Sequence, residues 1–202
     1  MEFPEIKKEL LRLNWSESAF KCESIDELIL DIKANIDWYL EKGVTAKNLK
    51  KWFSEKELRK RGICVGGNKS LMTSINTTIV VLGDGVFNVT SLMDCEVVVK
   101  VYDQGSVIIK AYNASKVAIT AKDSSSVTLI MYRDTNTSVE MQDNSTIEVA
   151  MLNSSCAKIN GNDSSKIVAL MRDNSSATIK TYQESKSTIK THDNAQAIEQ
   201  NL

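Results

Sequence analysis

The spacing of apolar residues changes along the chain at about residue 77. Before this point, apolar residues recur every three or four positions, which is typical of amphipathic helices. From about Thr77 to Glu199 they alternate with polar residues in runs of five, which is typical of strands with one buried face. The pattern therefore predicts a helical N-terminal part followed by a β-rich part.

The β-rich part repeats every ten residues, without an insertion from Val101 onward. In tens counted from residue 101, the third position is mostly Asp or Asn, the fifth is mostly Ser, and positions seven, nine and one are mostly apolar or small. The Asp/Asn-x-Ser cluster is turn chemistry, because these side chains hydrogen-bond their own backbone. A strand and a corner repeated about a dozen times predict a parallel β-solenoid (a β-helix) with positions seven, nine and one facing inward.

The outward, even-numbered positions indicate how many repeats make one turn. One set of alternate copies has Ile108, Lys110, Tyr112, Thr128, Ile130, Tyr132, Glu148, Ala150, Leu152, Val168, Leu170 and Arg172. The other set has Ala118, Thr120, Lys122, Ser138, Glu140, Gln142, Lys158, Asn160, Asn162, Thr178, Lys180 and Tyr182. The first set is more apolar, so the true period is twice the repeat. We therefore predict two repeats per turn, roughly six turns and a rod about 30 Å long.

The apolar side of this solenoid is the main candidate interaction site. It would contain Ile108, Tyr112, Ile130, Tyr132, Leu152, Val168 and Leu170. A patch of this size is larger than solvated surfaces usually tolerate. It could pack against the helices of its own chain or against the same face of another subunit. Helices placed before Thr77 would cover only the first turns, so we expect a homo-oligomer.

A column of carboxylates is the second candidate site. At two repeats per turn, Asp103, Asp123, Asp143 and Asp163 would stack along one corner about 5 Å apart. One interpretation is a row of weak Ca²⁺ sites. The interpretation that we favour is a ladder of Asp turns whose carboxylates accept backbone N–H bonds, since the Gly-rich nonapeptide of calcium-binding β-rolls is missing. We therefore predict no bound metal and no cofactor.

Helix start and stop signals divide the N-terminal part into three or four short helices, the first over residues 2–15. The signals are Ser24 with Glu27, Thr45, and Ser54 with Glu57 at the starts, and Gly43 and Gly62 at the ends. A single helix is predicted between Ser24 and Gly43. We expect a helical domain over residues 1–66, a linker over 67–76 and the solenoid over 77–202.

The last predicted helices carry a basic cluster formed by Lys50, Lys51, Arg59, Lys60 and Arg61. With helix-turn-helix spacing, such a cluster could contact the phosphates of a nucleic acid. The alternative, which we favour, is a solvated helix face with cations near the C-terminal end.

Composition narrows the function classes further. The formal net charge of −1 gives no general argument for binding nucleic acid or an anionic membrane. No apolar run approaches the ~20 residues of a membrane helix and the start lacks a signal-peptide pattern, so we expect a cytoplasmic protein without membrane contact. His192 is the only histidine, and the four cysteines lack metal-ligand spacing. We therefore expect no enzyme and no catalytic residues.

Residues 24–66 resemble the N-terminal part of uncharacterised proteins found in phages and prophages of gut Bacteroides. The resemblance lies in a helix with a glycine-containing turn over Asp31–Gly43, a helix with an aromatic residue over Asn48–Ser54, and a Gly-linked exit over Arg61–Gly66, all followed by a β-repeat. It implies a phage context and a virion-associated or fibre-like role. It supplies no site residues.

These observations lead to two hypotheses. The first is a non-enzymatic structural or adhesion module, made in the cytoplasm and assembled into a virion, that oligomerises through its apolar face and docks to other virion or host proteins. The alternative is a phage-encoded regulator or anti-defence protein that binds nucleic acid or a host protein through the basic cluster. A carbohydrate-active β-helix ranks last, because aromatic residues are sparse on the repeat.

Overall fold

A computed structural model describes residues 1–13 and 21–202 of the chain. These residues form two compact units, Met1–Val65 and Gly66–Leu202. The first unit is mostly helical and the second is built of parallel strands, so the two-part organisation predicted from the apolar spacing is present. Each unit is described by itself below.

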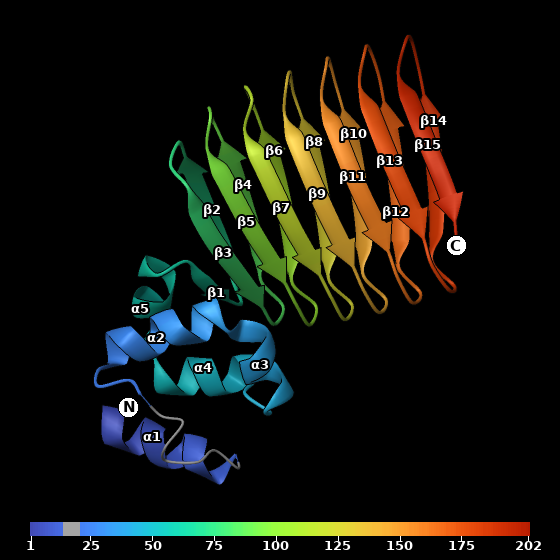
Figure 1. Ribbon diagram of the computed structural model, residues 1–202. Helices are drawn as coiled ribbons and strands as arrows, with labels where there is room; N and C mark the ends of the chain where they lie inside the picture. Colours follow the sequence, from blue (N-terminus) through green and yellow to red (C-terminus); the bar gives the residue numbers. More distant parts are fainter. Residues whose placement is uncertain (14–20) are drawn as a thin grey trace. The chain divides into compact units, whose positions relative to one another are not determined.

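Short helices make up most of the first unit. Its described residues form α1 (Phe3–Arg12), α2 (Ile25–Ala34), α3 (Ile36–Glu41), α4 (Ala46–Trp52), α5 (Glu55–Lys60) and the short strand β1 (Ile63–Val65) (Figure 1). Their apolar stripes supply a common core of Ile6, Leu10, Leu28, Ile29, Ile32, Ile36, Tyr39, Leu49, Trp52 and Leu58, each at most 2% exposed. Helices this short are unstable alone, so packing of these side chains holds them in place.

Most of the predicted helix ends are present. Ser54 and Glu57 form a capping box, in which the Glu57 N–H donates to Ser54 Oγ at 3.2 Å and the Ser54 N–H donates to Glu57 Oε2 at 2.8 Å. Thr45 caps α4 in the same way with Asn48. Gly43 and Gly62 have φ of +87° and +80°, a backbone conformation that residues with a Cβ rarely adopt.

Two predictions for this unit were wrong in detail. The single helix expected up to Gly43 is two helices that meet at Asn35, whose side-chain amide donates to the Asp31 carbonyl at 3.2 Å and so competes with the helix ladder. The capping box at Ser24 is half formed, because the Glu27 carboxylate accepts from the Glu23 N–H instead. The first helix ends at Arg12, and residues 14 and 15 of its predicted range lie outside the described residues.

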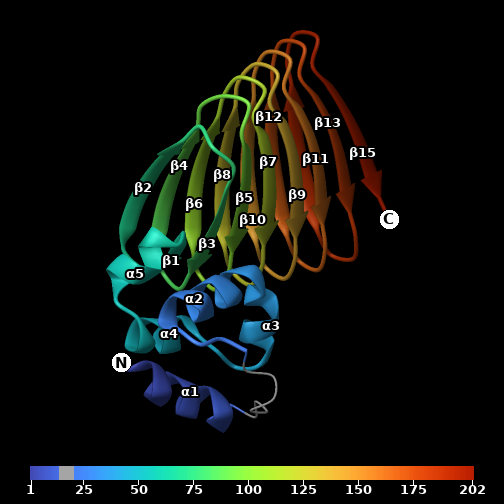
Figure 2. The same ribbon diagram turned by 60° about the vertical axis from the view of Figure 1, so that its left-hand side comes forward.

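The second unit is a parallel β-solenoid, as predicted. Its strands are β2 (Asn68–Thr73), β3 (Thr77–Leu82), β4 (Val86–Ser91), β5 (Glu96–Val101), β6 (Ser106–Ala111), β7 (Lys116–Ala121), β8 (Ser126–Met131), β9 (Asn136–Met141), β10 (Thr146–Met151), β11 (Cys156–Gly161), β12 (Lys166–Met171), β13 (Ser176–Thr181), β14 (Lys186–Thr191) and β15 (Gln196–Asn201). The even-numbered strands form one sheet and the odd-numbered strands from β3 form the other (Figures 1 and 2).

Strand pairing confirms two repeats per turn. Ile147 of β10 lies beside Val127 of β8 and Ile167 of β12, at a spacing of twenty residues. All neighbouring strands from β3 to β15 pair at the same spacing. The fourteen strands β2–β15, at two per turn, make seven turns. The expected number of roughly six was slightly low, because the thirteen strands from Thr77 onward make six and a half turns and one further strand lies in the segment 67–76 that was predicted to be a linker.

That strand is β2, and the linker prediction is therefore corrected. Asn68 of β2 pairs with Val86 of β4 and Thr73 pairs with Ser91, at a spacing of eighteen residues instead of twenty. The first turn is thus shorter than the others and falls outside the ten-residue frame, which is why the repeat does not reveal it.

The interior of the solenoid is filled by positions seven, nine and one, as predicted. Val127, Leu129 and Met131 are at most 1% exposed, and the equivalent residues of most other turns are buried as well. Position five is also buried from Gly105 to Ser175, and half-buried at Ser185 and Ala195. At Thr135 its hydroxyl donates to the carbonyl of Tyr132 in the same corner at 2.6 Å. The buried positions make each turn depend on its two neighbours, as expected for a solenoid.

Candidate interaction site

The predicted apolar face lies on the outer surface of the even-numbered sheet. Parallel pairing places Ile130 beside Ala150 and Ala150 beside Leu170, so these residues form one continuous column over three turns. Val168 lies two positions before Leu170 on the same strand and is 47% exposed. The column is a direct consequence of the twenty-residue register.

A second column follows the corner after each even-numbered strand. It contains Tyr112, Tyr132 and Leu152 in successive turns. The two tyrosine rings are stacked, with centroids 4.7 Å apart and an interplanar angle of 1°. Because Tyr132 is two residues from Ile130, the two columns run side by side and form one patch.

We define the apolar face as the seven residues predicted from the sequence. These are Ile108, Tyr112, Ile130, Tyr132, Leu152, Val168 and Leu170. Among them Val168 is exposed and the others are half-buried. Side chains of neighbouring turns stand about 4.8 Å apart and cover one another, so the patch is flatter than separate side chains would suggest.

Charged residues border the apolar face. Lys110 precedes Ile130 in its column and Lys190 follows Leu170, while Glu148 lies beside Val168. An apolar centre with a charged rim is the usual composition of a protein–protein interface. Tyrosine is among the residue types that contribute most to binding energy at such interfaces.

The opposite sheet has a different outer surface. Its outward residues include Ala118, Thr120, Ser138, Glu140, Lys158, Asn160, Thr178 and Lys180. Most are polar or small. The contrast between the two sides, expected from alternate repeats, is therefore present in the structure.

The carboxylate column forms a hydrogen-bonded ladder between turns. Asp123 and Asp143 have φ of +60° and +59°, in the left-handed region that Asp and Asn tolerate better than most residues. The backbone N–H of each donates to the carboxylate of the next turn: Gly83 to Asp103 at 2.9 Å, Asp103 to Asp123 at 2.9 Å, Asp123 to Asp143 at 3.1 Å and Asp143 to Asp163 at 3.0 Å. The carboxylates of the Asp column thus accept backbone N–H bonds, as the favoured interpretation expected, and these bonds link turns rather than staying within one corner.

A second ladder runs along the other corner and was not predicted. The Asn153 N–H donates to Asp173 Oδ2 at 2.8 Å, and the Arg133 N–H donates to Asn153 Oδ1 at 3.4 Å. In the sequence, this second ladder is indicated by the Asn or Asp at the third position of the alternate repeats, such as Asn153 and Asp173. Within residues 1–13 and 21–202, no group of three or more His, Cys, Asp or Glu side chains is placed to hold a metal ion.

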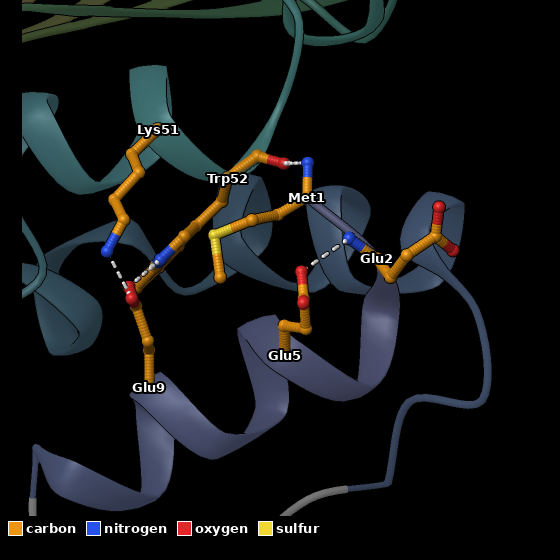
Figure 3. Close-up of polar contacts among 6 residues, drawn as sticks. All are labelled: Met1, Glu2, Glu5, Glu9, Lys51 and Trp52. Atoms are coloured by element: carbon orange, nitrogen blue, oxygen red, sulfur yellow. Dashed lines mark hydrogen bonds and ion pairs between the residues drawn. The ribbon is translucent and has the colours of Figure 1, made fainter.

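Ion pairs join Lys51 and Arg61 of the basic cluster to acidic residues of the helical unit. Lys51 pairs with Glu9 of α1, and Glu9 also accepts a hydrogen bond from Trp52 Nε1 at 2.5 Å (Figure 3). The hydrogen bond from Lys51, followed by that from Trp52, lowers the pKa of Glu9 below its ordinary value. Arg61 pairs with Asp26 at 2.6 Å. Lys51 and Arg61, both predicted phosphate contacts, are thus paired within their own unit.

The other three members of the cluster lie on the surface of α4 and α5. Lys50, Arg59 and Lys60 are exposed. Arg59 and Lys60 occupy the last turn of α5, where positive charge is favourable next to the helix C-terminus. This placement fits the solvated helix face that we favoured.

Comparisons with known proteins do not identify the chain. No family model, no curated protein and no solved structure matches it. The resemblance to phage proteins therefore stays a prediction. Among the described residues, no helix combines the length and apolar character needed to cross a membrane.

Proposed function

We propose that this protein is a non-enzymatic interaction module whose solenoid binds a second copy of itself through the apolar face. The observation that carries the proposal is the continuous column Ile130–Ala150–Leu170 beside the column Tyr112–Tyr132–Leu152. Such columns occur on one sheet only. Exposed apolar columns on one sheet and a polar surface on the other are expected where the apolar side is covered by a partner.

The chemistry of the face favours another copy as the partner. Lys110 and Lys190 lie in one column and Glu148 lies in the adjacent column. A second copy of the same face, related by a two-fold axis, can therefore place opposite charges against each other while its apolar residues meet. Parallel strands in a rigid coil also keep the face flat, so little conformational entropy is lost on binding.

The proposal can be tested with charge substitutions on the two sides of the solenoid. Ile130→Glu with Leu170→Glu introduces two carboxylates into the apolar face. Ala118→Glu with Thr178→Glu is the matched control on the opposite sheet. We expect size-exclusion chromatography with light scattering to show an oligomer for the wild type and the control, and a monomer for the apolar-face variant. Equal masses for both variants would contradict the proposal.

The phage context that the sequence resemblance implies would make this module a structural or adhesion part of a virion. A rigid rod that associates laterally suits such a role, because its length and side surfaces are set by the repeat. Finding the protein in purified particles by mass spectrometry would support this part of the proposal, and its absence from them would count against it.

The alternative function rests on the exposed cations Lys50, Arg59 and Lys60. If they contact phosphates, binding to duplex DNA should weaken steeply with salt and be lost in Arg59→Ala/Lys60→Ala. We expect no such binding, since Lys51 and Arg61 are already paired with Glu9 and Asp26.

A further inference from the structure

The interior of the solenoid becomes partly polar in its last turn. Along the odd-numbered sheet, position nine has Ile119, Val139, Ile159, Ile179 and then Glu199. Position one of that sheet ends in Asn201. Along the even-numbered sheet, Ile167 is followed by Ser187. At these positions the residues that fill the core elsewhere are replaced by groups that require hydrogen bonds, whereas the inward Ile189 and Ala197 stay apolar.

These polar groups bond to each other across the end of the core. The Ser187 hydroxyl of β14 donates to the Glu199 carboxylate of β15, which joins the two sheets. The Thr181 hydroxyl donates to Asn201 Oδ1 at 2.5 Å. These residues line a hollow of about 540 Å³ at the end of the coil. The side chains therefore place a polar layer over the last apolar turn.

This layer lies where the sheets expose their edges. β14 and β15 are the last strands of the even- and odd-numbered sheets. An uncovered strand edge is a template for another strand, from the same or a different chain. An added strand would bury the inward side chains beneath it, and burying an ionised carboxylate against apolar groups is strongly unfavourable. The exposed Lys186 and Lys190 of β14 oppose edge pairing in the same way.

We propose that Glu199, with Ser187 and Asn201, closes this end of the solenoid against the addition of further strands. Copies of the chain then associate by their sides and do not extend the sheets end to end. The inference concerns the end of the coil alone. It would hold whether or not the apolar face binds a second copy, so the two proposals can fail separately.

The test restores the core residues of the repeat at this end. Glu199→Ile with Asn201→Met gives positions nine and one the side chains found in Ile179 and Met141. The matched control is Gln196→Ile with Gln200→Met, which adds similar apolar groups to the same strand on its outward side. Both pairs are made in the Ile130→Glu/Leu170→Glu background, so that lateral association does not contribute to the measured mass.

Sedimentation velocity over a concentration series measures the outcome. We expect Glu199→Ile with Asn201→Met, the inward variant, to form heavier species with an association constant about tenfold or more above that of the control. Burial of one Ile side chain gives a factor of that order. Either tail-to-tail or head-to-tail pairing would raise the mass. An inward variant that keeps its β-sheet circular dichroism and sediments like the control overturns the proposal, as do end-to-end filaments of the unsubstituted protein. If the double variant loses its circular dichroism signal, Glu199→Ile alone is scored in its place.

Discussion

Two properties of Asp143 hold its corner of the solenoid, namely a left-handed backbone conformation and a hydrogen bond to its carboxylate. Three substitutions can separate these two contributions. Its φ of +59° lies in the left-handed region. Its carboxylate accepts the Asp123 N–H of the preceding turn at 3.1 Å, and its own N–H donates to Asp163 at 3.0 Å. Asn keeps both the hydrogen bond and the tolerance of this φ. Gly keeps only the tolerance, and Ala keeps neither.

These differences give an expected order of stability. Asp143→Asn should change the free energy of unfolding by less than about 0.5 kcal/mol. Asp143→Gly loses one exposed hydrogen bond and should cost about 1 kcal/mol. Asp143→Ala loses the same bond and adds about 1–2 kcal/mol for a left-handed Cβ, so it should cost about 2–3 kcal/mol in total.

Urea unfolding followed by far-ultraviolet circular dichroism measures all three variants against the wild type. The reasoning is refuted if Ala is as stable as Gly, since the left-handed conformation would then impose no constraint. It is also refuted if Asn costs as much as Ala, since the ladder would then depend on the carboxylate charge alone.

Three further predictions concern the core, the helical unit and metal. Leu129→Ala should cost about 2–5 kcal/mol in urea unfolding, because Leu129 is fully buried, while the outward control Thr128→Ala should change stability by less than about 0.5 kcal/mol. The lowered pKa of Glu9 means that its bonds to Lys51 and Trp52 stabilise the folded unit fully above the ordinary value of 4.5 and are lost as pH falls through the lowered value. The protection factors of the α1 amides, in which the intrinsic pH dependence of exchange is divided out, should therefore fall in acid for the wild type, and Glu9→Gln should abolish that fall; equal profiles for the two proteins would contradict it. EDTA should leave the melting temperature unchanged, because the ladder carboxylates already accept backbone N–H bonds; a drop that Ca²⁺ reverses would show the opposite.

The solenoid could be predicted from the sequence because its repeat is uninterrupted from Val101 onward. A constant spacing determines which side chains point inward, which neighbour each one has, and which outward residues share a side. The apolar face followed from the same spacing. Strand β2 could not be predicted, since its eighteen-residue offset from β4 breaks the frame.

The basic cluster shows where sequence reasoning stops. Lys51 pairs with Glu9, and Arg61 pairs with Asp26, at separations of 42 and 35 residues. No local pattern links such distant residues, so their charges could not be known to be paired. The break at Asn35 was missed for a related reason, because whether the Asn35 side chain points to solvent or bonds Asp31 depends on its surroundings.

The most direct test of the account is the mass of the unsubstituted protein in solution. One chain has a mass of 22.5 kDa. Sedimentation equilibrium at concentrations up to about 100 μM covers the range in which even weak specific self-association is populated. The account predicts a defined multiple of the chain mass that reverts to one chain when Ile130 and Leu170 are replaced by Glu. A single 22.5 kDa species across the whole range would contradict self-association through the apolar face.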